Sequence, residues 1–438
     1  MEKVKVLFIE NRGRTSFWAK VATDLECRGF EIHFLVQNPF FKPKGFENVH
    51  SIEIPNKKTI DTTVGQEPAE LQDYLKSRDR GFRYFNSGCD HYGHYHNKIK
   101  EVLETISPDL VVGECTLFHE LITIFLCKEL SLKFVHPTGT RYPPGRFNIF
   151  KNDEQNVAIG SGESWKTEDL DSFILGVCSG SVRPAYMKKR TSLYEIIRFN
   201  LYRLYGLVIV TLSRFKGEKF NTPSLWRKME LSQSLRKCKH NWEKVSSLPN
   251  SNKNILYLMQ MQPEANLDVW GAPFSDQTSA VKELASILPP DFNVIVKANP
   301  KAKYELFGFI NELENYPNVY FAPSYFTMDD LKSKTYGILT VSGTIGLESV
   351  FSNGNCISLA HPVLSSRFPK YSASSIANAV TKLLETECEI SEHNEARDLL
   401  SVLISDSFSG VVGDPLYSHH AFDRENISKV ASAIAKCI

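Results

Sequence analysis

The chain alternates short apolar runs with longer segments of mixed polarity. Each run is bounded by polar residues, proline or glycine, and is only a few residues long. Runs this short and this apolar are typical of strands buried on both faces of a parallel sheet. In the first half the runs are Lys5–Ile9, Glu31–Val36, Leu110–Gly113 and Lys133–Val135, and in the second half Ile255–Met259, Asn293–Lys297, Val319–Ala322, Gly337–Val341 and Cys356–Leu359.

The segments between these runs carry the marks of helices. Thr15 or Ser16 can cap a helix that continues to about Arg28, and Gly29 then stops it. Strands that alternate with helices along the whole chain predict the α/β class, with two doubly wound, Rossmann-like domains. The length of 438 residues also exceeds one ordinary core. The expected division is a Rossmann-like domain over 1–180, a helical insertion over 181–250, a second Rossmann-like domain over 251–420, and a terminal helix over 421–438.

The composition is that of a soluble globular protein, with 42% hydrophobic residues, 23% charged residues and a formal net charge of +1. This balance argues against a histone-like or disordered protein. Nine cysteines without a CxxC pair suggest neither a zinc ribbon nor a disulfide scaffold. No signal peptide is evident, and the longest uninterrupted apolar run near the middle, Leu204–Leu212, is too short to span a membrane. A cytoplasmic protein with reduced thiols is expected.

Segment 183–239 departs from this balance. It holds 14 Lys and Arg residues against three acids, and apolar and aromatic residues are interleaved with the basic ones. The pattern predicts two or three amphipathic basic helices. They suit an anionic membrane surface, a polyanionic glycan, or simply a solvated basic face of a helical hairpin. Nucleic acid is disfavoured because no RNA-binding motif accompanies the basic residues.

Polar side chains follow three predicted strands of the second half. Open α/β sheets hold their ligands at the carboxyl ends of their strands, so these groups predict one lip of a binding cleft. Glycines and hydroxyls at a strand-to-helix turn also suit a phosphate, which the helix dipole would stabilise. The groups are Gln262, Glu264, Asn266 and Asp268 after the first strand, Lys297 and Asn299 after the second, and Ser342, Gly343, Thr344 and Glu348 after another.

The first half offers its own candidates. Glu114 follows a strand and precedes a helix, as a catalytic carboxylate would, although it could equally be a helix-capping acid. Arg141 and Arg146 lie in a Pro/Gly-rich loop after a strand, where they suit a carboxylate or phosphate or are ordinary surface arginines. The histidines of segment 88–96 resemble a metal cluster, but no distant partner ligands stand out. We therefore expect no metal. The segment is expected to be a loop that runs into the helix Asn97–Ile106, with the histidines on a solvated face.

Three blocks of the second half resemble the bacterial capsule and surface-polysaccharide biosynthesis proteins, which include β-Kdo transferases. In that family the blocks look like QPEAS…G…DQ, then KEHP, then TGTxGxEA. The corresponding blocks here are MQPEAN…G…SDQ, VKANP and VSGTIGLES, within residues 254–362. The matching residues are Gln262, Pro263, Glu264, Ala265, Gly271, Asp276 and Gln277, then Lys297 and Pro300, then Gly343, Thr344, Gly346 and Glu348.

The resemblance implies a GT-B fold, in which two Rossmann-like domains face a cleft and bind acceptor and donor respectively. It implies a CMP-activated sugar, with Kdo as the first candidate, and no metal cofactor if backbone amides and Lys297 hold the phosphate. Asn299 stands where the family has a histidine, and it can donate a hydrogen bond but cannot carry a positive charge.

Roles follow for the candidate residues. Glu114 would be the acceptor base or the acid/base, and Glu264 or Asp268 the carboxylate close to the anomeric carbon. The donor would be held by Gln262, Lys297, Asn299, Pro300, Ser342, Gly343, Thr344 and Glu348, and the acceptor by Arg141 and Arg146. The expected protein is a cytoplasmic glycosyltransferase, peripheral at the inner membrane face, that acts on a glycan or lipid-linked acceptor. The alternatives are a non-catalytic glycan- or partner-binding member and a CDP-polyol phosphotransferase.

Overall fold

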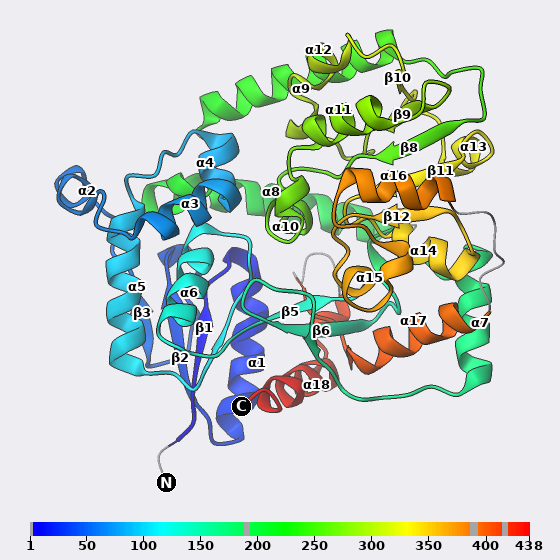
Figure 1. Ribbon diagram of the computed structural model, residues 1–438. Helices are drawn as coiled ribbons and strands as arrows, with labels where there is room; N and C mark the ends of the chain where they lie inside the picture. Colours follow the sequence, from blue (N-terminus) through cyan, green and yellow to red (C-terminus); the bar gives the residue numbers. More distant parts are fainter. Residues whose placement is uncertain (1–2, 188–192, 386–392, 414–418) are drawn as a thin grey trace. The chain divides into compact units, whose positions relative to one another are not determined.

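The computed structural model describes residues 3–187, 193–385, 393–413 and 419–438 (Figure 1). The chain folds into two compact units, and it passes between them several times. Unit 1 comprises Met1–Lys166, Arg183–Ser224 and Leu400–Ile438, and unit 2 comprises Thr167–Val182 and Leu225–Leu399. The sequence predicted continuous domains over 1–180 and 251–420, whereas α7 belongs to unit 2 and the terminal helix to unit 1.

Unit 1 is built on a mixed sheet with the order β13-β6-β5-β4-β1-β2-β3, and β7 also pairs with β6. The strands β1 to β5 are parallel, while β6, β7 and β13 add an antiparallel edge. The order reverses between β1 and β4, which makes their carboxyl ends the switch point of this sheet. The strands are β1 Lys5–Ile9, β2 Glu31–Val36, β3 Val49–Ser51, β4 Leu110–Val112, β5 Phe134–Gly139, β6 Arg146–Lys151, β7 Ala158–Ile159 and β13 Phe408–Ser409.

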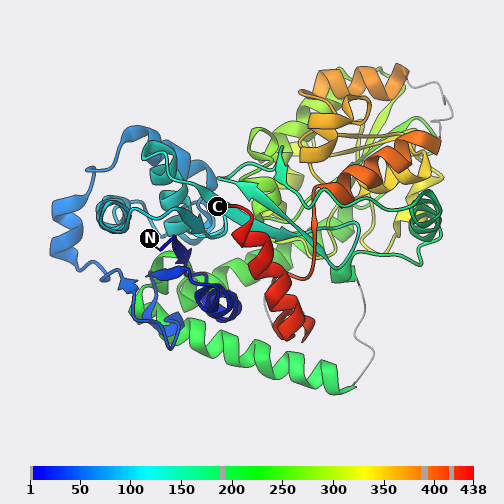
Figure 2. The same ribbon diagram turned by 90° about the horizontal axis from the view of Figure 1, so that it is seen from below.

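The first and last helices of the chain share the core of unit 1. Phe8 of β1 packs in one cluster with Trp18 of α1 and Ile434 of α18. The last helix of the chain, α18, therefore lies beside the first, α1 (Figures 1 and 2). The helices that lie in unit 1 are α1 Thr15–Cys27, α2 Lys57–Thr63, α3 Ala69–Arg78, α4 Arg80–Phe85, α5 Tyr92–Ile106, α6 Phe118–Glu129, α8 Leu193–Ser213 and α18 Arg424–Ala435, and α17 His393–Ser405 joins the two units.

Unit 2 has a five-stranded parallel sheet with the order β10-β9-β8-β11-β12, whose switch point lies between β8 and β11. Alternate residues of β8 face opposite layers of helices: Tyr257 enters one core with Trp242 of α9, and Leu256 enters the other with Leu331 of α13. The strands are β8 Asn254–Leu258, β9 Asn293–Lys297, β10 Val319–Phe321, β11 Gly337–Thr340 and β12 Cys356–Ser358. The helices are α7 Thr167–Cys178, α9 Leu225–Val245, α10 Ala265–Asp268, α11 Gln277–Ile287, α12 Phe309–Leu313, α13 Met328–Lys332, α14 Ile345–Ser352, α15 Pro362–Arg367 and α16 Ile376–Glu385.

The predicted α/β class with two doubly wound units is confirmed. Every apolar run named in the sequence forms a strand, and β1, β2 and β9 have the predicted bounds. Residues 40–80 and 150–180, for which the sequence pattern predicted no strand or helix, form β3, α2, α3, β7 and α7. These elements are short or lack a strong apolar period, so packing rather than local pattern decides them.

The histidine-rich segment is also corrected. Helix α5 begins at Tyr92, and its histidines are buried rather than solvated. His94 Nε2 lies 2.8 Å from the Glu53 carbonyl oxygen, and the His91 ring stacks on Phe220 with centroids 3.9 Å apart. The histidines that the sequence placed on a wet face are thus part of the packing of unit 1.

Segment 183–239 forms two long helices, of which only α9 is strongly basic. Within α8 the charged residues are Glu195, Arg198 and Arg203, so the description as a basic amphipathic helix is wrong there. Part of the basic sequence, residues 188–192, lies outside the described residues. By length and composition alone, the helix over Ile196–Lys216 is apolar enough to cross a membrane. This helix contains no uninterrupted apolar run of that length in the sequence, because Arg198 and Arg203 interrupt its apolar residues.

Candidate functional site

The first and third sequence blocks meet at the switch point of unit 2. The Gln260 amide, just past β8, lies 3.0 Å from Ser342 Oγ, just past β11. Ser342 Oγ also donates to the Asn266 carbonyl oxygen (3.1 Å), and with its amide turned to satisfy its neighbours Gln260 accepts from the Gly343 N–H (2.8 Å). Residues 82 positions apart therefore form one polar edge, where parallel α/β sheets bind ligands.

Gly343 is needed for this turn. A Cβ atom at Gly343 would stand 2.6 Å from Thr340 Oγ1, and the Thr340 side chain is fully buried. The glycine lets the chain turn tightly from β11 into α14, with Ser342 and Thr344 before the first helical residue. The amino end of an eight-residue helix and two hydroxyl residues thus lie at the carboxyl end of β11, which is the arrangement that suits a phosphate.

Gln262, Asp268 and Gln277 hold the loop after β8 together. Both carboxylate oxygens of Asp268 accept hydrogen bonds, one from Gln262 Nε2 (2.8 Å) and one from the Glu264 N–H (2.9 Å), and Asp268 is only 3% exposed. Gln277 Nε2 donates to the Gln260 carbonyl and to Gln262 Oε1 at 2.8 and 3.2 Å. These contacts give Asp268 a positioning role in the loop.

Glu264 differs from Asp268 because it is only partly buried. It occupies the position just before α10, and its Oε1 accepts a hydrogen bond from Asn266 Nδ2 (2.8 Å). Of the two carboxylates that the sequence nominated, Glu264 is the one whose surface a ligand can reach. Its catalytic role stays a prediction.

The second sequence block lies at the end of β9, next to β8. Lys297 is 8% exposed and its Nζ donates to the Phe326 carbonyl oxygen (2.6 Å); burial lowers its pKa, although Asp330 and Glu243 act in the opposite direction. Asn299 Oδ1 accepts from the Lys301 N–H (2.9 Å), which fixes the turn before the exposed Pro300. The lysine at this edge therefore points toward the β10–α13 loop.

Two further positions complete the edge around α14. Glu348 is partly buried near the beginning of α14. His361 follows β12, next to β11, and its N–H donates to Ser358 Oγ (3.2 Å). No role was predicted for His361 from the sequence, although its position after the predicted strand Cys356–Leu359 could have indicated a site residue.

In unit 1 the segments after β1 and β4 meet at the second switch point. The Arg14 guanidinium forms an ion pair with Glu114 Oε2. Asn11 Nδ2 donates to Thr116 Oγ1 and to Glu120 Oε1, both at 2.9 Å. Glu114 was predicted as a site residue, and the structure places it at the carboxyl end of β4 beside the loop that carries Arg14.

Glu114 is not the cap of helix α6. That role belongs to Glu120, whose carboxylate accepts from the N–H groups of Glu114, Thr116 and Leu117 at 2.9–3.1 Å. Glu114 is 6% exposed, and its Oε1 is buried without a hydrogen-bond partner among the described residues. Burial raises the pKa of Glu114, and the Arg14 cation partly opposes this shift. A carboxylate with a raised pKa and one unused oxygen is equipped to accept a proton.

A deeper layer of charge lies behind this pair, and the sequence did not indicate it. Glu10 is fully buried, and burial together with the charge of Glu218 raises its pKa to about 8. Arg12 NH2 pairs with Glu218 Oε2 at 2.7 Å, and His119 Nε2 lies 2.8 Å from the Glu10 carbonyl oxygen. These residues come from three separate stretches of chain, so only the fold brings them together.

The two predicted arginines of the β5–β6 hairpin differ. Arg146 is 7% exposed and donates to Ser407 Oγ and the Ser407 carbonyl (both 2.8 Å) and to Glu163 Oε2 (2.8 Å). These bonds tie β6 to the segment before β13, and the acceptor role of Arg146 stays a prediction. Arg141 is partly exposed in the hairpin turn, and its acceptor role stays a prediction.

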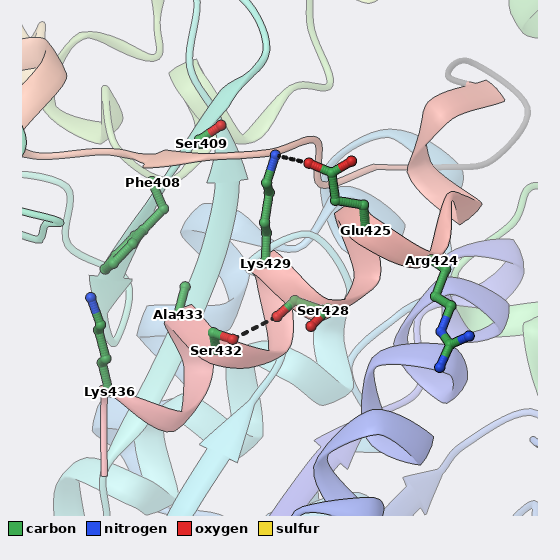
Figure 3. Close-up of a pocket in the computed structure, with 9 residues that line it drawn as sticks. All are labelled: Phe408, Ser409, Arg424, Glu425, Ser428, Lys429, Ser432, Ala433 and Lys436. Carbon is green, nitrogen blue, oxygen red and sulfur yellow. Dashed lines mark hydrogen bonds and ion pairs between the residues drawn. The ribbon is translucent and has the colours of Figure 1, made fainter.

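A hollow of 730 Å³ lies along α18 of unit 1 (Figure 3). Among its charged side chains, Lys429 forms an ion pair with Glu425 (2.6 Å). None of the residues that line the hollow was a candidate site residue from the sequence. The lining residues are Phe408, Ser409, Arg424, Glu425, Ser428, Lys429, Ser432, Ala433 and Lys436. The hollow gives no support to a second site.

Fold and site together define an α/β protein in which each of two doubly wound units has a polar switch point. No known protein family matches the chain by sequence, and no curated protein matches it either. Among solved structures it is similar to the UDP-GlcNAc 2-epimerase from Methanocaldococcus jannaschii, with 14% identity, 92% of this chain and 99% of that chain covered, and a TM-score of 0.27. It is also similar to the UDP-GlcNAc 2-epimerase from Neisseria meningitidis bound to UDP-GlcNAc, with 13% identity, 99% of this chain and 100% of that chain covered, and a TM-score of 0.28.

The β-Kdo 2,4 transferase KpsC from Thermosulfurimonas dismutans is also similar, at 11% identity, with 63% of this chain and 78% of that chain covered, and a TM-score of 0.26. At these identities and scores, the similarities identify neither a substrate nor a reaction. The functional argument therefore rests on the residues themselves.

Proposed function

We propose that this protein is a glycosyltransferase that moves a sugar from a nucleotide-activated donor to a glycan or lipid-linked acceptor. The observation that carries the proposal is the hydrogen bond from Ser342 Oγ to the Asn266 carbonyl oxygen (3.1 Å), which joins the first and third sequence blocks at the switch point of unit 2. A nucleotide bound there would place its phosphates against the Ser342–Thr344 turn and the amino end of α14.

The leaving nucleotide phosphate must be stabilised as its charge develops. The positive end of the α14 helix dipole would act on this charge, and Lys297 supplies a cation if its side chain leaves the Phe326 carbonyl. Glu264 is proposed as the carboxylate near the anomeric carbon, because Asp268 is committed to the loop. Glu114 of unit 1 is proposed as the base that removes the acceptor proton.

The sequence resemblance names CMP-Kdo as the first candidate donor, in surface-polysaccharide assembly at the cytoplasmic face of the membrane. Asn299 in place of a histidine is compatible with hydrogen bonding to a nucleotide but not with a charged contact. The alternatives are a non-catalytic glycan- or partner-binding member and a CDP-polyol phosphotransferase. The nucleotide that binds separates these possibilities.

We predict that CMP raises the thermal stability of the wild-type protein and that Gly343→Ala abolishes this effect. A ligand at one hundred times its dissociation constant stabilises by about 2.7 kcal/mol, whereas a Cβ at Gly343 would displace the turn through its 2.6 Å approach to Thr340. Thermal unfolding with CMP, CDP, UDP and GDP measures this.

The matched control is Gly413→Ala, since a Cβ there meets nothing within 4 Å and the backbone needs no positive φ. A response to CDP alone would support the polyol phosphotransferase. No response to any nucleotide would contradict the donor site and favour the non-catalytic member.

We also predict that Glu264→Gln and Asp268→Asn act differently. Glu264→Gln should abolish transfer and keep nucleotide binding, because the partly buried side chain would act on the sugar. Asp268→Asn should lower the stability of unit 2 by about 1–3 kcal/mol, because an amide cannot accept both hydrogen bonds that Asp268 receives. Urea unfolding and donor turnover separate the two, and wild-type turnover in Glu264→Gln would refute the assignment.

A further inference from the structure

Helix α8 presents a continuous apolar stripe to solvent. The stripe consists of residues spaced four, four, three, four and four apart, so it follows one side of the helix. Its members and their exposed fractions are Leu193 71%, Ile197 51%, Leu201 63%, Leu204 59%, Val208 48% and Leu212 52%. Ile196, Leu207 and Tyr205 adjoin the stripe and are 40%, 46% and 64% exposed, and Tyr202, 43% exposed, lies farther round the helix. Single exposed leucines are ordinary, but a stripe over a whole helix marks a binding surface.

The other side of α8 faces unit 1. Phe199, Gly206, Ile209 and Val210 are partly buried, and Ser213 is fully buried where the helix ends. The packed residues and the stripe thus lie on different sides of the helix. Helix α8 packs mainly against the short helices that follow it, η4 Arg214–Lys216 and η5 Glu218–Phe220, and the described residues of unit 1 leave the stripe uncovered.

The carboxyl end of α8 carries the chemistry of a membrane boundary. After the helix come Phe215, which is 86% exposed, and the exposed Lys216. Basic residues beside an apolar stripe are attracted to anionic lipid headgroups, while an aromatic ring partitions to the interface. This charge pattern favours a lipid surface over an apolar face of another protein.

The path of the chain argues against a helix that crosses the bilayer. Before α8, helix α7 is held in unit 2 by two hydrogen bonds from Arg397 to Asp171 (2.6 and 2.7 Å). After α8, Glu218 is held in unit 1 by Arg12 (2.7 Å). The chain then returns to unit 2, where Trp242 of α9 donates to the Ala322 carbonyl (2.9 Å).

A crossing would place α7 and Glu218 on opposite sides of the membrane, and the chain would have to cross back before Trp242. The link from Phe220 to Leu225 spans at most about 18 Å when extended, against about 30 Å of hydrocarbon. Helix α9 cannot serve as the return span, because it carries charged residues along its length. Both ends of α8 therefore stay on one side of the membrane.

We propose that α8 is an in-plane membrane anchor, whose Leu193–Leu212 stripe inserts into the headgroup and acyl boundary of an anionic bilayer. A helix of 21 residues, about 31 Å long, would lie parallel to the surface with unit 1 on its other side. The inference goes beyond the proposed transfer reaction and does not depend on which donor binds, although it accords with a lipid-linked acceptor.

The test is flotation of the full-length protein with vesicles of phosphatidylcholine, with and without phosphatidylglycerol. We expect the protein to float with the anionic vesicles, and Leu201→Glu/Val208→Glu to lower the bound fraction about tenfold or more, since charge in the stripe opposes insertion. Both positions are exposed, so folding should survive. The matched control is Leu175→Glu on α7, an equally exposed leucine (65%) outside the stripe, which should float like the wild type.

Depth is measured by placing tryptophan singly at Leu193, Leu204 and Leu212 and quenching with lipids brominated at different acyl positions. An in-plane helix gives shallow quenching at all three, whereas a deep signal at Leu204 alone would overturn the in-plane orientation. Failure to float, together with sedimentation showing a dimer that Leu201→Glu/Val208→Glu dissociates, would make the stripe a contact between two copies and refute the proposal. Nucleotide binding, read by thermal shift in the same variants, reports separately on the transfer function.

Discussion

Glu114→Gln is expected to lower the rate of sugar transfer by about 10²–10⁴-fold, the usual contribution of a general base, while nucleotide binding to unit 2 is unchanged. The amide keeps the size of the side chain but cannot accept the acceptor's proton. Initial rates with saturating donor measure the loss, and thermal shift with the nucleotide measures binding. Glu104→Gln, an exposed glutamate on α5, is the matched control and should be as active as the wild type.

The Arg14 pair makes this prediction sharper. Glu114 must be ionised to act as a base, so activity falls as the pH drops through its pKa, which burial raises and Arg14 lowers. Removing the cation with Arg14→Gln should raise the pKa of Glu114 further, and the acidic limb of the kcat/KM profile should move to higher pH. An unshifted limb, or near-normal turnover in Glu114→Gln, would remove Glu114 from the reaction.

The sheets could be predicted from the sequence because their strands are buried on both faces. A run such as Val294–Val296, flanked by polar residues, has no stable alternative outside a sheet. The antiparallel edge of unit 1 could not be predicted in this way. Strands β7 and β13 have two residues each, which is too short for a recognisable sequence pattern. They are identified as strands by their pairing with β6.

The candidate site was predictable wherever one local segment carries the signal. Glu114 and Ser342 were identified because each directly follows an apolar run, and the carboxyl ends of parallel strands are where ligands bind. The partners of these residues were not predictable, since Arg14 lies 100 positions from Glu114 and Glu218 lies 206 positions from Arg12. Asp268 and Arg146 show the converse: the hydrogen bonds of a polar residue near a strand end also hold the fold together.

We further expect the stability of unit 1 to fall steeply on acidification below about pH 6.5, because three buried histidines must be neutral in the folded state. Burial lowers the pKa of His119 and His136 to about 4 and that of His91 to about 3. Between these values and 6.5 the unfolded chain binds more protons than the folded one, so protonation favours unfolding. His119 and His136 each contribute roughly 3 kcal/mol across their windows and His91 roughly 5 kcal/mol, which together is comparable to the about 5–15 kcal/mol of a typical domain.

The titration of Glu10 changes the stability of unit 1 in the opposite direction and determines how stability varies above pH 6.5. Its pKa is about 8 in the folded state against 4.5 as the ordinary value, so the folded state binds the extra proton, and stability falls as the pH rises between these values. Below pH 6.5 the three histidines outweigh it, and above pH 6.5 Glu10 lowers stability by about 2 kcal/mol before its titration is complete. The profile should therefore have its maximum near pH 6.5.

Urea unfolding at pH 5, 6.5 and 8.5, followed by hydrogen exchange of the β1 and β4 amides, measures both sides of this maximum. His136→Asn should reduce the acid loss, because asparagine cannot take up the proton, whereas His420→Asn should not, since the His420 side chain is 84% exposed. Glu10→Gln should flatten the alkaline side and steepen the acid side, because Glu10 titrates between pH 4.5 and about 8. If stability were equal at pH 6.5 and 8.5 in the wild type, Glu10 would be ionised at little cost. The buried charges of Arg12 and Glu218 would then have to be balanced differently from the arrangement at this switch point.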